Sequence, residues 1–99
     1  MTSKQKAETI RNQFGGRALF MIDADCLVAH ENGSLSFRFK CSKIANYVKI
    51  TPNKNDLYDL KFMKIWGRKY NIIKEINDVG VGNLHKVFEE TTNLKLSLQ

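Results

Sequence analysis

The sequence predicts an α+β fold, with an N-terminal helix, an antiparallel meander of five or six strands, a C-terminal helix, and the helices packed on one sheet face. Three observations favour this class. Apolar residues recur at helical spacing near both ends of the chain, apolar and polar residues alternate through the middle, and turn signals such as Asn32-Gly33 separate the alternating runs. Because 99 residues suffice for one core, we expect a single globular domain over residues 1–99.

The first element is an amphipathic helix over residues 3–14. Ser3 is a suitable N-cap, because its hydroxyl can accept a hydrogen bond from a free backbone N–H of the first turn. Glycine tolerates the left-handed conformation that ends many helices, so Gly15-Gly16 marks the end of this one. The apolar stripe consists of Ala7, Ile10 and Phe14.

Two strand predictions follow the helix. The apolar run "ALFMI", residues 18–22, lies between glycines and acidic residues and is expected to form a strand covered on both faces. Residues 26–31 and 34–39 flank Asn32-Gly33, a pair that favours a two-residue type I′ turn. We therefore expect a tight hairpin over this stretch.

That hairpin register makes a prediction about the two cysteines. It places His30 opposite Leu35 and Cys26 opposite Phe39 on the apolar face, with Cys41 diagonal to Cys26. Diagonal neighbours lie about 7–8 Å apart, whereas the Cβ atoms of a disulfide lie about 3.5–4.5 Å apart. We expect two reduced, half-buried thiols.

Three more strands are expected over residues 46–51, 57–66 and 70–76. Alternation in the second of them slips near Met63-Lys64, which a β-bulge would explain. Asn77-Asp78 is expected to close the third strand.

A helix over 84–92 is indicated by an apolar stripe, Asn93 is a suitable C-cap, and the alternation of residues 94–98 predicts a short terminal strand. The stripe consists of Leu84, Val87, Phe88 and Thr91.

Charge is concentrated in the middle of the chain. The formal net charge is +6, and residues 36–74 hold ten cationic and two acidic side chains, a net charge of +8. This asymmetry indicates a polyanionic or acidic partner. No apolar run approaches the roughly 20 residues of a membrane-spanning helix, and the start lacks a secretory signal, so we expect a cytoplasmic protein.

The residues that carry enzyme chemistry do not form a convincing constellation. His30 and His85 are the possible bases for a Cys26 or Cys41 nucleophile, but no third group is placed to orient either base. Cys26, His30 and Cys41 also lack the spacing and the fourth ligand of a zinc site. We therefore expect no enzymatic activity, no metal and no cofactor.

The strongest functional candidate is a basic sheet face. Arg38, Lys40, Lys49 and Lys61 are expected to point away from the core, with Tyr47 in phase among them. A second candidate is the corner formed by Trp66, Arg68 and Lys69, which has the composition of an interface hot spot. The ordinary alternatives are a solvated sheet face and a tryptophan that caps the core.

Four segments resemble a family of small phage-, prophage- and plasmid-encoded proteins. They are "IRNQFGGRALFMI" (10–22), "HENGSLSFRFKCSKIANYVKIT" (30–51), "DLYDLKF" (56–62) and "LHKVFEETTNLKLSL" (84–98). The chain departs from the family pattern at Asn93, where glycine is usual, and at Lys95, where an aromatic residue is usual. The shared motifs are caps, turns and strand alternation.

The resemblance implies a mobile-element protein acting in the cytoplasm of a host bacterial cell. It favours a non-enzymatic counter-defence inhibitor of the anti-CRISPR type, which binds a host protein or ribonucleoprotein effector. The alternative is a direct binder of RNA or DNA that uses the basic sheet face. Neither the target nor the oligomeric state follows from the sequence, and a homodimer through residues 94–98 stays open.

Overall fold

The computed structural model describes residues 3–40 and 42–94. The elements in chain order are α1 (Ser3–Phe14), α2 (Gly16–Met21), β1 (Asp25–Ala29), β2 (Leu35–Arg38), β3 (Tyr47–Pro52), β4 (Tyr58–Trp66), β5 (Lys69–Val79), the 3₁₀ turn η1 (Val81–Asn83) and α3 (Leu84–Thr92). The five strands form one antiparallel meander in the order β1-β2-β3-β4-β5, which confirms the predicted α+β fold. The terminal strand predicted over residues 94–98 lies outside the described residues, apart from Leu94.

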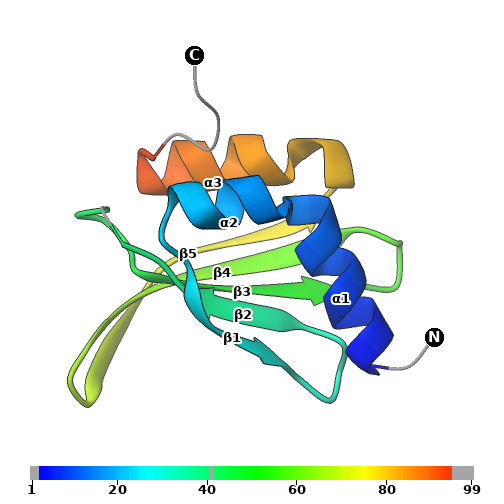
Figure 1. Ribbon diagram of the computed structural model, residues 1–99, viewed down its shortest axis with the longest axis horizontal. Coiled ribbons are helices and arrows are strands. Elements are labelled where there is room, and N and C mark those ends of the chain that lie inside the picture. Colours follow the sequence, from blue (N-terminus) through cyan, green and yellow to red (C-terminus); the bar gives the residue numbers. More distant parts are fainter. Residues whose placement is uncertain (1–2, 41, 95–99) are drawn as a thin grey trace.

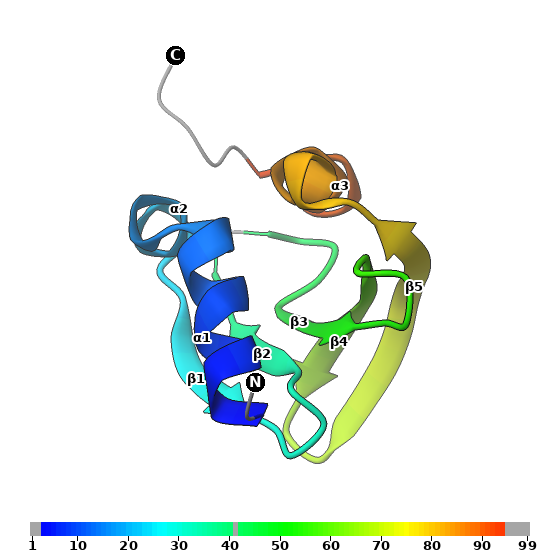
Figure 2. The ribbon, with the colours of Figure 1, turned by 90° about the vertical axis from the view of Figure 1, so that its right-hand side faces the viewer.

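The helices cover only one face of the sheet (Figure 1). Figure 2 shows α1 and α2 over the β1–β2 half and α3 over the β5 side. The opposite sheet face therefore carries no helix from the described residues.

No helix in the part of the chain that the structure describes is long and apolar enough to cross a membrane.

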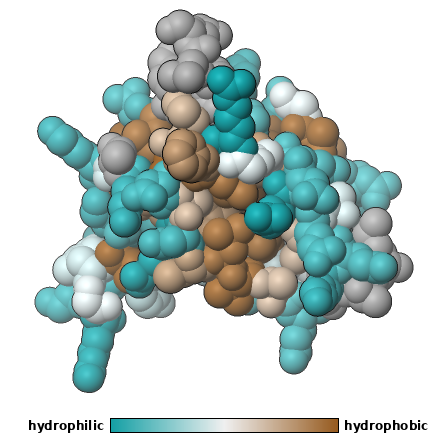
Figure 3. Space-filling view, in the orientation of Figure 1, coloured by the Kyte–Doolittle hydropathy of each residue, from teal (hydrophilic) through white to brown (hydrophobic). Residues whose placement is uncertain are grey.

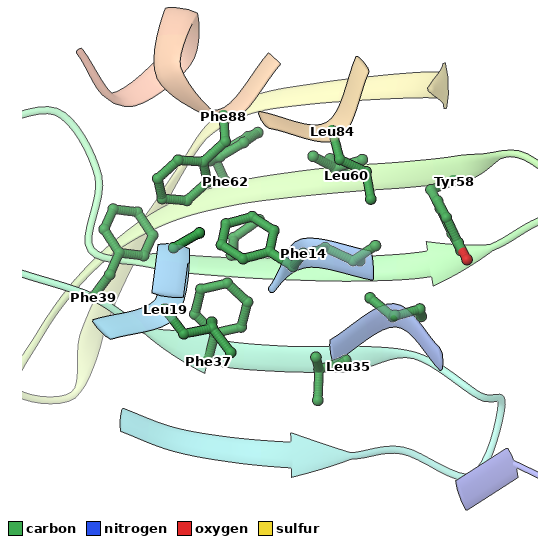
Figure 4. Close-up of a cluster of buried hydrophobic side chains, with 14 of the residues drawn as sticks. Phe14, Leu19, Leu35, Phe37, Phe39, Tyr58, Leu60, Phe62, Leu84 and Phe88 are labelled. Atoms are coloured by element: carbon green, nitrogen blue, oxygen red, sulfur yellow. The ribbon is translucent and has the colours of Figure 1, made fainter. Parts of the chain in front are cut away.

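Aromatic rings fill the space between the helices and the sheet (Figure 4). Phe14 of α1 makes edge-to-face contacts with Phe37 of β2 and Phe88 of α3, at centroid distances of 5.3 and 5.4 Å. Phe39 packs on Phe88 in the same manner at 4.9 Å. Such pairs stabilise a core beyond the area that they bury. Phe14 thus connects the first helix to both the sheet and the last helix.

The predicted helix over residues 3–14 is confirmed as α1. Ala7, Ile10 and Phe14 are all buried. The helix ends at Gly15, whose φ is 96° and whose N–H donates to the Arg11 carbonyl at 2.9 Å. A positive φ is accessible to glycine without a Cβ clash, which explains the break at this residue.

The strand predicted over residues 18–22 is wrong, because this stretch lies mostly in the short helix α2. Ala18, Leu19 and Ile22 are buried, whereas Phe20 is 84% exposed. The apolar residues therefore face the core at i, i+1 and i+4, which is helical spacing. Alanine, leucine and methionine also have high intrinsic helix propensity, and the apolar run alone could not reveal this choice.

The two-residue turn predicted at Asn32-Gly33 is also wrong. The N–H of Gly33 donates to the His30 carbonyl at 3.0 Å, and the N–H of His30 donates to the Ser34 carbonyl at 2.9 Å. The loop therefore has three residues and ends on Gly33 at a φ of 87°, as in a turn followed by a glycine bulge. The Asn32 side chain holds this loop by accepting hydrogen bonds from the N–H and hydroxyl of Ser34.

The longer loop moves the hairpin register by one residue. Ala29 lies opposite Leu35 and Val28 opposite Ser36, so the predicted pairing of His30 with Leu35 is wrong. A further irregularity lies between Asp25 and Val28, where Cys26 has a φ of 53°. Cys26 is exposed as a result and not half-buried as predicted. Cys41 lies outside the described residues.

The predicted irregularity near Met63 exists, but the extra residue belongs to β5. Phe62 lies opposite Lys74 and Met63 opposite Ile72, which leaves Ile73 as the bulged residue. β5 also continues to Val79 through Asp78, whose φ is 59°, so the strand does not close at Asn77-Asp78 as predicted. A left-handed residue within a strand is typical of a bulge that bends the chain without ending its pairing.

The predicted C-terminal helix is confirmed as α3, with Leu84, Phe88 and Thr91 buried and Val87 half-buried. Asn93 has a φ of 62°, and its N–H donates to the Glu89 carbonyl at 2.8 Å. This is the left-handed C-cap that the sequence predicts.

Replacing Phe14 by alanine should reduce the free energy of unfolding by about 3–5 kcal/mol, because it removes the ring that contacts both the sheet and α3. Chemical denaturation monitored by circular dichroism measures the change. The matched control is Phe20→Ala, since Phe20 is 84% exposed, and it should change stability by less than about 0.5 kcal/mol. Equal losses in both variants would contradict the central role of Phe14.

Candidate binding surface

The sheet face opposite the helices, called the outer face below, gathers most of the predicted basic residues. Cross-strand pairing places Ser36, Lys49, Lys61 and Glu75 in one row across β2 to β5. It places Arg38, Tyr47, Met63 and Ile72 in the next row. Directly opposite residues in neighbouring strands share a face. Arg38, Tyr47, Lys49 and Lys61 therefore lie on one surface.

The outer face is less basic than the sequence indicates. The Lys61 ammonium lies 3.7 Å from the Glu75 carboxylate, and Asp59 is paired with Thr51 on the same face. A shallow hollow of about 310 Å³ is bordered by Lys49 and these charged side chains. An exposed ion pair adds little stability, but it cancels charge locally. Arg38 and Lys49 remain the main sources of positive potential on the outer face.

Lys40 is separated from this set. It follows the end of β2, and its N–H donates to the Ile22 carbonyl at 3.0 Å. Its ammonium lies 3.3 Å from the Asp23 carboxylate, in the segment between α2 and β1. Lys40 thus links the helical layer to the sheet, apart from Lys49 and Lys61.

An apolar area completes the outer face, and sequence reasoning missed it. Met63 and Ile65 of β4 lie opposite Ile72 and Tyr70 of β5. Tyr70 is 61% exposed and Ile72 is 49% exposed. The available signal was the alternation of residues 63–65 and 70–72, but the bulge predicted at Met63-Lys64 assigned Ile65 to the wrong face, because the extra residue belongs to β5. The outer face therefore combines cations with adjacent apolar and aromatic side chains.

The predicted corner of Trp66, Arg68 and Lys69 forms the tip of the β4–β5 hairpin, which extends past β3 in Figure 1. Gly67 begins the turn with a φ of 60°, the position that a type II′ turn reserves for glycine. Trp66 is 46% exposed and lies outside the buried core cluster, so it does not cap the core. All three side chains are accessible to a partner.

The side of this hairpin opposite the outer face carries unopposed positive charge. Lys64, Lys69 and Lys74, called the hairpin lysines below, lie on the same side as Trp66. Among the described residues, no carboxylate oxygen lies within 4 Å of any of their ammonium groups. Lys69 and Lys74 lie diagonal to Lys64 across the two strands, at a spacing that long side chains can bridge, so an anion between them would reduce their repulsion. Lys64 and Lys74 are functional candidates that sequence reasoning did not select.

Asn46 holds the base of the hairpin in place. Its side-chain amide donates to the Ile65 carbonyl at 2.7 Å, and its side-chain oxygen accepts the Ile65 N–H at 2.8 Å. The amide thereby continues the β3–β4 hydrogen bonding by one further pair. Such paired hydrogen bonds fix the direction in which β4 leaves the sheet.

The histidines occupy structural positions. The His30 Nε2 atom lies 2.8 Å from the Ser36 hydroxyl, but Ser36 is only 1% exposed and cannot be reached by a substrate. His85 packs edge-to-face on Phe14 and hydrogen-bonds to the Phe14 carbonyl. Within residues 3–40 and 42–94, no three or more His, Cys, Asp or Glu side chains cluster in a way that could hold a metal ion.

A second exposed apolar area lies on the side that carries the helices. The space-filling view shows apolar residues at the centre of this side, with hydrophilic residues to either side of them (Figure 3). Phe20 of α2 is 84% exposed and Leu27 of β1 is 38% exposed, and both border a shallow groove of about 260 Å³ with Arg11 and Asp23. This area contains none of the predicted site residues.

Comparisons with protein-family models, with curated proteins and with solved structures found no match for this chain. The resemblance to phage and plasmid proteins therefore stays a prediction from the sequence motifs.

Replacing Asn46 by alanine should loosen the hairpin, because the N–H and carbonyl of Ile65 lose their partners. We expect a loss of about 1–3 kcal/mol in stability and faster hydrogen exchange at the Ile65 amide. The control is Asn55→Ala, which removes an exposed amide from the β3–β4 loop. Unchanged exchange at Ile65 would show that other contacts hold the hairpin.

The protonation of His30 should depend on Lys49. Burial, and then the charge of Lys49, hold the pKa of His30 below its ordinary value of 6.5. Since the unfolded chain then binds this proton more tightly, the His30 contribution to stability is lost as the pH falls through 6.5. Lys49→Met should raise this pKa while leaving it below 6.5, because burial remains.

An NMR titration of the His30 ring protons measures this pKa directly. Lys4→Met removes an exposed lysine from α1 and is the control, which should leave the His30 pKa unchanged. A pKa at or above 6.5 in the unmodified chain would contradict the assigned cause.

Proposed function

We propose that this chain is a non-enzymatic binding protein that contacts an acidic protein or nucleoprotein partner through the outer face and the β4–β5 hairpin. One observation carries the proposal: the sheet face that no described helix covers unites Arg38 and Lys49 with exposed apolar and aromatic side chains. Protein interfaces combine these residue types, with aromatic and arginine side chains as anchors.

The residue composition of the outer face favours a binding surface for a partner over an ordinary solvated sheet face. A solvated face needs only polar side chains, yet Tyr70 and Ile72 lie exposed beside one another across from Met63 and Ile65. Contiguous exposed apolar residues cost solubility, and they are typical of recognition sites. The neighbouring cations favour an acidic patch on the partner.

The finer proposal is that the partner is a host nucleoprotein effector and that the chain is a counter-defence inhibitor of the anti-CRISPR type, encoded by a phage or other mobile element. Its support is the sequence resemblance together with the positive charge of residues 36–74. A basic inhibitor can engage the RNA or an acidic surface of such an effector, both of which carry negative charge.

The second candidate function is direct binding of RNA or DNA. It is favoured by the position of Tyr47 between Arg38 and Met63 in one row and next to Lys49 along β3. An aromatic ring among cations can stack on an unpaired base while the cations neutralise phosphates. Binding of this kind weakens steeply as salt concentration rises, because each phosphate contact releases a counterion.

Reversing two charges of the outer face, in the double variant Arg38→Glu with Lys49→Glu, should abolish partner capture. Tagged protein is incubated with host lysate, with and without nuclease, and retained molecules are identified. The unmodified chain should retain a protein after nuclease treatment, and the double variant should lose it, because attraction to an acidic patch becomes repulsion.

The matched control is Lys4→Glu with Lys54→Glu, which makes the same change in net charge at exposed positions on α1 and the β3–β4 loop. It should capture the partner normally. Equal capture by all three proteins would contradict a role for the outer face. Retention of nucleic acid alone, lost after nuclease, would replace the lead function by the second candidate.

A further inference from the structure

Among the described residues, β5 forms the longer of the two sheet edges. It is the last strand in the sheet order, and nine of its eleven residues are exposed. Backbone N–H and carbonyl groups at alternate positions of an edge strand point away from the sheet, free to pair with another chain. The other edge, β1, has five residues and is interrupted between Asp25 and Val28. β5 is therefore the better template for an added strand.

The two sides of this edge differ in chemistry. On the outer face the edge carries Tyr70 and Ile72, both exposed. On the opposite side it carries Lys69 and Lys74, next to Lys64 of β4. Side chains of a strand alternate between faces, so a strand added along β5 would meet apolar groups on one face and ammonium groups on the other.

The bulge at Ile73 creates this arrangement. Five positions separate Lys69 from Lys74, an odd number that would place them on opposite faces of a regular strand. The extra residue restores them to one face, since Lys69 lies opposite Trp66 and Lys74 opposite Phe62, two β4 residues of the same face. The hairpin lysines thus act together along one side of the edge.

We propose that the β5 edge binds an extended segment of a partner protein in which apolar and acidic residues alternate, and that this segment adds to the sheet as a further strand. The inference rests on the proposed function and supplies its binding mode and the chemistry of the partner. Main-chain hydrogen bonds to β5 give affinity, and the two sets of alternate side chains give specificity.

Charge and geometry favour this peptide segment over a nucleic acid and over a second copy of the chain. A nucleic acid would satisfy the lysines but leave Tyr70 and Ile72 in water. A second copy paired antiparallel through β5 would bring the lysine-bearing sides together, because a twofold axis normal to the sheet keeps each face on its own side. Like charges facing each other across strands are destabilising. An acidic and apolar strand satisfies both sides.

The test uses two synthetic peptides as long as β5. One alternates glutamate with valine and tyrosine, and the other has lysine in place of every glutamate. Hydrogen exchange of the full chain is followed by NMR with each peptide in excess. The acidic peptide should slow exchange at β5 amides and leave β1 amides unchanged, and the basic peptide should have no effect.

A charge exchange then tests the lysines. Lys69→Glu with Lys74→Glu should weaken binding of the acidic peptide by about tenfold or more and should create binding of the basic peptide. Lys4→Glu with Lys54→Glu makes the same change in net charge elsewhere and should bind the acidic peptide normally. The reciprocal gain separates a change of specificity from a loss of folding.

Two results would overturn the inference. One is the absence of protection at β5 amides with the acidic peptide in excess, whether or not other parts of the chain are protected. The other is unchanged binding in Lys69→Glu with Lys74→Glu. If the lysate partner is nevertheless captured and lost only in Arg38→Glu with Lys49→Glu, the proposed function survives without strand addition. If no partner is captured while the acidic peptide protects β5, the edge binds as inferred and the proposed function fails.

Discussion

The contacts of the Phe14 ring determine the arrangement of the layers. This side chain is fully buried and packs edge-to-face against Phe37 in the sheet and Phe88 in the last helix. His85 also lies against it and hydrogen-bonds to its carbonyl group, so the C-terminal end of α1 and the start of α3 are joined at one point. This cluster gathers the three described α-helices on one sheet face, and no described helix covers the other face (Figure 2).

The helices at the two ends were predictable because each has a periodic apolar stripe and a terminal glycine or asparagine. The predictions for residues 18–22 and for the Asn32 loop were wrong because hydrophobic periodicity did not contain the information that decides these structures. The run over residues 18–22 is apolar throughout, so helix and strand could not be distinguished without the burial of Ala18 and the exposure of Phe20. The Asn32 loop depended on a side-chain hydrogen bond that a turn rule does not contain.

The candidate site was predictable in part for the same reason. Regular strands share faces at alternate residues, so Arg38, Tyr47, Lys49 and Lys61 could be grouped from sequence alone. Lys64 and Lys74 could not be grouped, because an irregularity in a partner strand changes the phase of every residue beyond it. The pairing of Lys40 with Asp23 was hidden as well, since it depends on α2 being a helix.

The meander order has a consequence for folding during synthesis. Each strand pairs with the strand made just before it, so the sheet can grow as the chain leaves the ribosome. The aromatic core cannot close in the same way, because Phe88 packs on Phe14, Phe39 and Phe62 and is made after all of them. Until α3 emerges, the surfaces of these rings that Phe88 covers are exposed, and exposed apolar surface of this kind makes a nascent chain prone to aggregation. The position of one phenylalanine late in the chain thus defines the interval during which this protein is most vulnerable to aggregation.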